Sequence, residues 1–577
     1  MQGGEPVKHL RPYMKKYKLQ SILAPAFKML EAGFDLTVPL LVARIIDDGI
    51  AAGDSRVIWT NFALMLLMAL LGLSCSFTAQ YFAAKAAIGS AAGLRRDLLS
   101  HIQTLSFTEL DTIGTATLIT RMTSDINQVQ NGINMFLRLF LRSPFIVFGA
   151  MILVFTLNTH LALVFVAVIS VLFVIVFGMM KITNPKYKAL QKNLDGVTAA
   201  TRENLNGVRV IRAFGREETQ VQEFAAINAR LAVSQLNVGR ISAMLNPLTY
   251  VVVNAAIIAV LWLGAGKVEN GVLLRGDLVA MINYIGQILI ELVKLANLIV
   301  LLSKAMASLG RVEQILDTPS SMHFDGTESG SNTDTILEFQ NVALQYSGAG
   351  AESVSGISFS LKKGQTLGII GGTGSGKSSL VSLIPRFYDA TEGAVLLKGV
   401  PIENLKEDVL RKSVAVVQQK AQLFAGTIRS NLLWGNENAS DAELWQALQT
   451  AQAAEFVQEK GLDAPVEQGG RNLSGGQKQR LTIARALLCK PEILILDDSA
   501  SALDYATDAA LRAAIKNLPG DMSLVIVSQR TASIQHADNI LVLEDGLLAG
   551  QGKHEDLLVT CPVYREIYES QFRKEEA

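Results

Sequence analysis

The residues best placed for chemistry begin at position 371, where a glycine-rich run reads GGTGSGKSS. An apolar stretch, TLGII, precedes the run, and a helix-favouring stretch, SLVSLIPRF, follows it. This strand–loop–helix context is the one that a phosphate-binding loop requires. Backbone N–H groups of such a loop cradle phosphates, its lysine reaches the terminal phosphates, and its serine can ligate Mg²⁺. The predicted nucleotide-binding residues are Gly371, Gly372, Thr373, Gly374, Ser375, Gly376, Lys377, Ser378 and Ser379.

Two carboxylates end an apolar run further along the chain, PEILILDD (491–498). We expect a buried parallel strand here, which delivers Asp497 to the edge of the sheet where ligands bind in open α/β folds. Asp497 would then hold Mg²⁺ through water, and Asp498 would lie beside the attacking water. Capping of the helix that follows is the alternative role, and it suits Asp498 better than Asp497.

A third motif, RNLSGGQKQR (471–480), lies between the first two. With the three in this order, residues 336–577 resemble the ATPase of an ATP-binding-cassette (ABC) transporter. Residues 1–317 resemble the six-span domain of the exporter branch of that family. The resemblance implies that ATP and Mg²⁺ are the cofactors. It also implies that SFTELDTIG (106–114) and GVRVIRAFGREE (207–218) are cytosolic coupling segments that dock on the ATPases.

The resemblance also assigns roles to individual residues. Tyr346 matches the aromatic residue that stacks on adenine, and Gln419 matches the glutamine that senses magnesium. The signature would bind the γ-phosphate of ATP held by another subunit, and its residues are Leu473, Ser474, Gly475, Gly476 and Gln477. The implied metal ligands are Ser378, Gln419 and Asp497, and the implied catalytic residues are Asp498, Gln529 and Gln419.

Three positions depart from the family pattern. Asp498 stands where the family has a glutamate as general base, and Gln529, in IVSQR (526–530), stands where it has a histidine. Gln468 occupies a normally acidic position in VEQGG (466–470). A base must reach the water it activates, and glutamine cannot carry the charge of an imidazolium. Together these departures resemble the degenerate-site subunit of bacterial heterodimeric multidrug exporters.

The motifs belong to a chain that is too apolar to be wholly soluble. Of its 577 residues, 50% are hydrophobic and only 18% are charged. Six apolar segments are each long enough to cross a hydrocarbon core of about 30 Å. A soluble ATPase is therefore excluded, and the net charge of zero gives no reason to expect a nucleic-acid partner. The predicted spans are 20–46, 57–84, 136–157, 159–181, 240–265 and 274–303.

The predicted organisation is a membrane protein of two domains joined by a linker. Residues 1–317 form an all-α transmembrane domain of six helices, and residues 336–577 form an α/β phosphate-loop ATPase domain. Between them, residues 318–335 are rich in Ser, Thr, Gly and Asp and read as a linker. Basic residues concentrate at the N-terminus and in the two long connections, which predicts that these connections and both termini face the cytosol. The expected location is the cytoplasmic membrane.

Charged residues also occur inside two of the predicted spans. Lys28, Glu31 and Asp35 share one helical face, and Glu291 and Lys294 lie near Gln287 on another. Intramembrane charges are costly unless they face water or a partner. They would line a translocation cavity or form an interhelical ion pair. The carboxylates of Glu31 and Asp35 would favour cationic amphiphiles.

The function we predict is ATP-driven export of amphipathic compounds (drugs, lipids or peptides) by a heterodimer of two different half-transporters. This chain would contribute a degenerate ATP site and the signature of the competent site of its partner. Three alternatives remain open at this stage. They are a homodimeric exporter, an importer of metal chelates on the same scaffold, and an ATP-gated channel or regulator.

Overall fold

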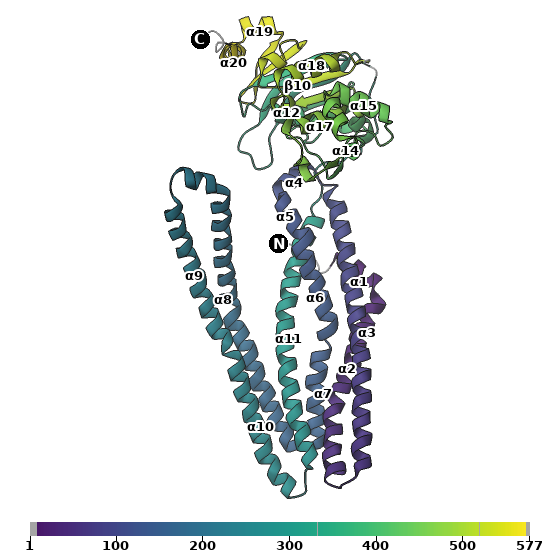
Figure 1. The fold of residues 1–577 in the computed structure, drawn as a ribbon, viewed down its shortest axis with the longest axis vertical. Coiled ribbons are helices and arrows are strands. Elements are labelled where there is room, and N and C mark those ends of the chain that lie inside the picture. The colour runs from purple at the N-terminus through teal and green to yellow at the C-terminus, as the bar shows by residue number, and fades with distance from the viewer. Residues whose placement is uncertain (1–7, 332, 519, 573–577) are drawn as a thin grey trace. The chain divides into compact units, whose positions relative to one another are not determined.

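The structure is a computed structural model that describes residues 8–331, 333–518 and 520–572 (Figure 1). The chain forms two compact units. The first consists of residues 1–103 and 116–318, and the second of residues 104–115 and 319–577. The short segment 104–115 therefore groups with the second unit, although the chain on both sides of it belongs to the first.

In the residues that the structure describes, the first unit contains helices joined by short connections and no strand, as predicted. α7 ends at Leu157, and the Asn158 side chain caps α8 by accepting a hydrogen bond from Leu161 N at 3.2 Å. α8 and α9 run side by side as a long hairpin (Figure 1). The helices are α1 (Arg11–Lys16), α2 (Lys18–Arg44), α3 (Ser55–Ile102), α5 (Thr115–Thr120), α6 (Ile126–Leu139), α7 (Arg142–Leu157), α8 (Thr159–Ala213), α9 (Glu217–Ala243), α10 (Leu245–Glu269) and α11 (Arg275–Leu316), with π-helical turns at Ile45–Ile50 and Arg121–Asp125.

The six predicted spans correspond to α2, α3, α7, α8, α10 and α11. Within the described residues, five helical stretches are long and apolar enough to cross a membrane. α2 is not one of these five, and it carries Lys28, Glu31 and Asp35 along its length. Its 27 residues nevertheless exceed the roughly 20 that a span requires.

Small residues let the helices of this unit approach closely. The face of α3 that is buried is mostly alanine, including Ala79, Ala83 and Ala87. A Cβ added at Gly132 of α6 would lie 2.4 Å from the Cβ of Ala305 on α11, so only glycine fits there. Large apolar side chains such as Trp59, at 69% exposure, point outward instead. Close packing by small residues with an apolar exterior is typical of a membrane bundle.

The second unit is a mixed α/β domain, as predicted, built on a six-stranded sheet of order β12-β11-β3-β10-β9-β6. Neighbouring strands of this sheet pair in parallel, except for β11 and β12, which are antiparallel. A second, antiparallel sheet has the order β2-β1-β4-β5, and β7 and β8 form a two-stranded ribbon. The strands are β1 (Thr335–Leu344), β2 (Val354–Lys362), β3 (Thr366–Gly371), β4 (Glu392–Leu397), β5 (Val400–Pro401), β6 (Val414–Val417), β7 (Gly426–Thr427), β8 (Pro465–Val466), β9 (Ile493–Asp497), β10 (Ser523–Val527), β11 (Asn539–Glu544) and β12 (Leu547–Gly552).

Helices cover the main sheet of this unit. One apolar core fills the space between the two sheets, where Phe339 stacks on Phe359 at 4.5 Å. A second apolar core lies between the main sheet and a group of helices that includes α15 and α17. The helices are α4 (Phe107–Ile113), α12 (Lys377–Leu383), α13 (Glu407–Ser413), α14 (Ile428–Leu432), α15 (Asp441–Thr450), α16 (Ala454–Lys460), α17 (Gly475–Leu488), α18 (Tyr505–Lys516), α19 (His554–Thr560) and α20 (Pro562–Phe572).

Candidate nucleotide site

The predicted phosphate loop joins the end of β3 to the start of α12. β3 ends at Gly371 in the middle of the parallel sheet, so the loop emerges at its carboxyl edge. Gly376 immediately precedes α12 with a φ of 90°, in the left-handed region that favours glycine. A Cβ at this position would lie 2.4 Å from the carbonyl oxygen of Ser353. The backbone of the loop can therefore take this path only with glycine at 376.

The Lys377 ammonium group lies inside the loop. Nζ donates hydrogen bonds to the carbonyl oxygens of Gly371 (2.9 Å) and Gly372 (2.5 Å) and to Ser375 Oγ (3.3 Å). Burial lowers the pKa of Lys377, although the carboxylates of Asp498 and Asp497 act in the opposite direction. A cation held among loop carbonyls is positioned to meet phosphate oxygens that enter the loop.

Asp497 and Asp498 lie at the end of β9, two strands from β3 in the same sheet. Ser378 Oγ donates to Asp497 Oδ1 at 3.4 Å, and Gln419 Nε2 donates to Asp498 Oδ2 at 3.1 Å. Burial raises the pKa of both carboxyl groups, and the nearby charge of Asp498 raises the pKa of Asp497 further. Two desolvated carboxylates beside a hydroxyl group are the chemistry that a hard divalent cation neutralises.

These groups line one cavity of about 550 Å³. It brings together Lys377, the two carboxylates, Gln419 and Gln529, which come from distant parts of the chain. The full lining is Glu352, Ser353, Thr373, Gly374, Ser375, Gly376, Lys377, Ser378, Ser379, Gln419, Asp497, Asp498, Val527, Gln529, Asp545 and Gly546.

Five of these lining residues were not predicted from the sequence, and one of them, Val527, is the last residue of β10. Glu352 and Ser353 precede β2, and Asp545 and Gly546 form the turn between β11 and β12. The Asp-Gly pair after an apolar run was a visible turn signal. The sequence of this turn did not indicate that the turn reaches the phosphate loop.

Tyr346 lies beside the loop but does not line the cavity. Its hydroxyl group donates to Ser379 Oγ at 3.1 Å, and its ring meets that of Tyr388 edge to face at 5.0 Å. The hydroxyl group of Tyr388 in turn donates to Asp111 of α4. Burial and the charge of Asp111 raise the pKa of Tyr388, which keeps this phenol protonated at neutral pH.

The five predicted signature residues lie apart from the cavity, at the start of α17. Ser474 caps this helix, with its Oγ accepting from Gln477 N at 3.3 Å and its backbone N donating to Gln477 Oε1 at 3.0 Å. Ser474 and Gly475 are exposed, and a Cβ at Gly475 would meet nothing within 4 Å. Because the N-terminus of a helix attracts anions, this exposed end is suited to a phosphate brought by another molecule.

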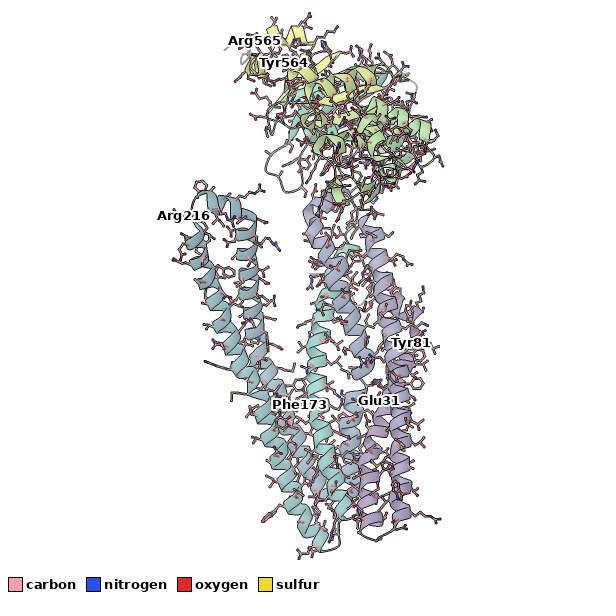
Figure 2. The ribbon with its side chains drawn as sticks, viewed as in Figure 1. Glu31, Tyr81, Phe173, Arg216, Tyr564 and Arg565 are labelled. Carbon is pink, nitrogen blue, oxygen red and sulfur yellow. The ribbon has the colours of Figure 1, made fainter. Side chains whose placement is uncertain are left out.

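The two predicted coupling segments fall in different units. α4, in the first segment, packs in the second unit, where the rings of Phe107 and Phe387 lie 4.8 Å apart. Glu109 of α4 is held by Ser106 and by Ser321 N (3.3 Å). Burial alone would raise the pKa of Glu109, but these hydrogen bonds hold it below its usual range. Segment 207–218 forms the turn between α8 and α9, with Arg216 at its tip (Figure 2).

The residues present fit a magnesium nucleotide. A buried lysine faces the space enclosed by a glycine-rich loop, and two carboxyl groups with raised pKa values lie on its other side. Ser378 and Asp497 would hold the ion, and Gln419 would offer its Oε1 to it while its Nε2 keeps the hydrogen bond to Asp498.

Comparisons with known proteins agree with this geometry. The family model of the ABC transporter transmembrane region matches residues 21–292, and the family model described as ABC transporter matches residues 354–501. The uncharacterized ABC transporter ATP-binding protein YfiB of Bacillus subtilis is 35% identical over 98% of both chains. The ATP-dependent lipid A-core flippase 1 of Colwellia psychrerythraea is 28% identical over 98% of this chain and 96% of its own. A solved bacterial Atm1-family ABC exporter with ATP bound covers 98% of each chain with a TM-score of 0.77 at 22% identity, which shows a shared fold.

Proposed function

Because this chain belongs to the ABC transporter family, whose members couple ATP hydrolysis to transport, we propose that it is one half of a heterodimeric exporter. Its own site binds ATP and Mg²⁺ but hydrolyses the nucleotide weakly. Its signature completes the competent site of a different half-transporter in the cytoplasmic membrane. The cargo is an amphipathic compound, in line with the lipid in the name of the flippase from Colwellia psychrerythraea.

The observation that carries this proposal is the pairing of an intact phosphate loop with altered catalytic positions. Lys377, Ser378 and Asp497 keep the groups that bind a magnesium nucleotide. Asp498 is one methylene shorter than the glutamate of the family, and its Oδ2 accepts a hydrogen bond from Gln419. A displacement of about 1 Å in a catalytic group can reduce a rate on the order of 10²-fold.

Gln529 weakens the site in a second way. Its side-chain amide can donate a hydrogen bond to a phosphate, but it remains neutral at every pH. The histidine it replaces can carry a positive charge, which stabilises the negative charge that develops during phosphoryl transfer. Mg²⁺, held by Ser378, Asp497 and Gln419, would supply charge neutralisation, so binding survives where hydrolysis is slow.

Transport follows from the exposed signature. Two cassettes that hold ATP between them approach each other, and the coupling segments transmit this movement to the membrane helices. The cavity between the helices then opens outward. Hydrolysis at the site of the partner separates the cassettes and resets the transporter.

The test measures the ATPase activity of two samples. One is the purified chain alone, and the other is this chain mixed with its partner half-transporter, identified by co-purification from the native membrane. We expect low ATPase activity from the chain alone and much higher activity from the mixture. The control is the mixture carrying Ser474→Ala in this chain, which should lose that gain. A homodimeric exporter is the correct function if the chain alone hydrolyses ATP as fast as the mixture.

A further inference from the structure

Six charged side chains meet inside the membrane unit, on three helices that are far apart in the sequence. They lie on α2, α7 and α11, and Glu31 lies about half-way along the helices (Figure 2). We refer to them as the intramembrane charge cluster. Its members are Lys28, Glu31, Asp35, Arg142, Glu291 and Lys294.

Arg142 of α7 holds the cluster together. Its two terminal nitrogens donate to Glu291 Oε1 at 2.5 Å and to Asp35 Oδ2 at 2.9 Å. Glu291 also accepts hydrogen bonds from Lys294 Nζ (2.8 Å) and Ser143 Oγ (2.7 Å). Glu291 is therefore a fully partnered carboxylate, which explains how it can be buried to 4% side-chain exposure.

The cluster contains three cations and three carboxylates, so it is neutral. On α2, Lys28 Nζ lies 2.5 Å from Glu31 and 3.0 Å from Ser76 Oγ. The carboxylates of Glu31 and Asp35 are thus already paired with Lys28 and Arg142. The side chain of Glu31 is 14% exposed and that of Asp35 is 46% exposed. Of the two carboxylates predicted to favour cationic amphiphiles, only Asp35 is therefore accessible to a ligand.

Beside the cluster lies a cavity of about 270 Å³. Ligand pockets typically measure roughly 300–1,000 Å³, so this cavity holds the headgroup of an amphiphile and not the whole molecule. Apolar side chains flank the charged ones, which suits the junction between a headgroup and a tail. The lining is Asp35, Val38, Arg142, Ile146, Gln287, Ile290, Glu291 and Lys294.

Two charged groups of opposite sign remain accessible in this lining. The side chains of Asp35 and Lys294 are 46% and 42% exposed, whereas that of Arg142 is 12% exposed. Gln287 Oε1 is buried and has no hydrogen-bond partner within the described part of the chain. A buried acceptor without a donor is costly.

We propose that this cavity binds the headgroup of a zwitterionic amphiphile. The cationic group of the ligand lies against Asp35, its anionic group lies against Lys294, and a donor on the ligand or a bridging water satisfies Gln287. A purely cationic headgroup would be repelled by the ammonium group of Lys294, and a purely anionic one would be repelled by the carboxylate of Asp35. This inference rests on the proposed export of amphipathic compounds and names the class of headgroup.

The test measures binding of three probes with the same six-carbon tail to the assembled transporter in lipid nanodiscs. The probes are hexylphosphocholine (zwitterionic), hexyltrimethylammonium (cationic) and hexyl phosphate (anionic). Isothermal titration calorimetry measures the binding of each. The variants are Lys294→Met and Asp35→Asn, with Lys304→Met as the matched control because Lys304 lies on the same helix outside the cavity. Glu291 keeps Arg142 and Ser143 in Lys294→Met, so we expect this variant to fold.

We expect the wild-type transporter to bind the zwitterionic probe most tightly. Lys294→Met should weaken that binding about tenfold, as loss of a charge-assisted hydrogen bond does, without weakening binding of the cationic probe. Asp35→Asn should weaken binding of both the zwitterionic and the cationic probe. The proposal is overturned if the cationic probe binds most tightly, if no probe binds, or if Lys304→Met and Lys294→Met behave alike. No nucleotide is present in these titrations, so the result is independent of which chain hydrolyses ATP.

Discussion

Asp497 and Asp498 illustrate at the residue scale how one sheet edge gives two adjacent carboxylates different environments. Ser378 donates to Asp497, whereas Gln419 donates to Asp498. Burial raises the pKa of both, so each group contributes most to stability when protonated, at low pH. That contribution is lost as the pH rises through the raised pKa. At neutral pH the pair therefore destabilises the fold until a cation neutralises it.

Substitutions at Ser474 and Asp498 should have unequal effects on the assembled transporter. Ser474→Ala removes a donor from the γ-phosphate at the competent site, and loss of such a preorganised donor costs roughly 10²–10³-fold in rate. If the site of this chain is weak, as proposed, Asp498→Asn affects that site alone, and transport should persist at a modestly lower rate. Steady-state ATPase and vesicle-transport assays on both variants provide the measurement.

The matched gain-of-function variant is Asp498→Glu combined with Gln529→His. It should raise hydrolysis at this site without a corresponding gain in transport. If instead Asp498→Asn abolishes transport while Ser474→Ala leaves it intact, this chain is the catalytic half and the assignment is reversed.

At the scale of elements, α4 is connected to the phosphate loop through two tyrosines. Asp111 of α4 accepts from Tyr388, whose ring contacts that of Tyr346, and Tyr346 donates to Ser379 of the loop. All four residues belong to the second unit. A change at Tyr346 when nucleotide binds can therefore reach α4 by direct contacts, which gives this segment a physical route for coupling.

Tyr388→Phe should lower the amount of cargo moved per ATP hydrolysed, because it removes the hydroxyl group that bonds Asp111. ATP binding should stay unchanged, since Tyr388 does not line the nucleotide cavity. Asp111→Asn, alone and combined with Tyr388→Phe, completes a double-mutant cycle in which contacting residues typically couple by about 0.5–3 kcal/mol. Additive effects on the transport-to-ATPase ratio would contradict the connection.

At the scale of the whole molecule, the phosphate loop and the signature of this chain lie at separate places in the second unit. The signature residues at the start of α17 do not line the nucleotide cavity of the same chain. A complete site therefore needs two chains. In the proposed transporter, this chain supplies the phosphate loop of one site and the signature of the other.

This division predicts unequal nucleotide exchange in the assembled transporter. Nucleotide at the loop of this chain should be replaced on the order of 10²-fold more slowly than at the site of the partner, because the proposed base Asp498 has a shorter side chain than glutamate. A photo-crosslinkable ATP analogue, chased with unlabelled ATP during turnover, measures the two rates on separable chains. Equal rates of loss from both chains would show that this site turns over normally.

The sequence by itself determined the elements and the motifs of this protein. Apolar segments of span length predicted α2, α3, α7, α8, α10 and α11, and alternating strand and helix patterns predicted the α/β unit. The phosphate loop and the acidic strand end could be located because their requirements are local. Gly376, for example, has a φ of 90°, which favours glycine for a local reason.

The tertiary structure alone decided which distant residues meet. Asp35, Arg142 and Glu291 lie on three different helices, and no local pattern indicated that Arg142 would join them. The same holds for Gln419, predicted as a metal ligand and found donating to Asp498, and for the turn at Asp545. Periodicity along a chain specifies which face of a helix or strand is apolar, whereas pairing between elements depends on how their faces pack. The nucleotide site could therefore be predicted from its motifs, and the intramembrane cavity emerged only when three helices were packed together.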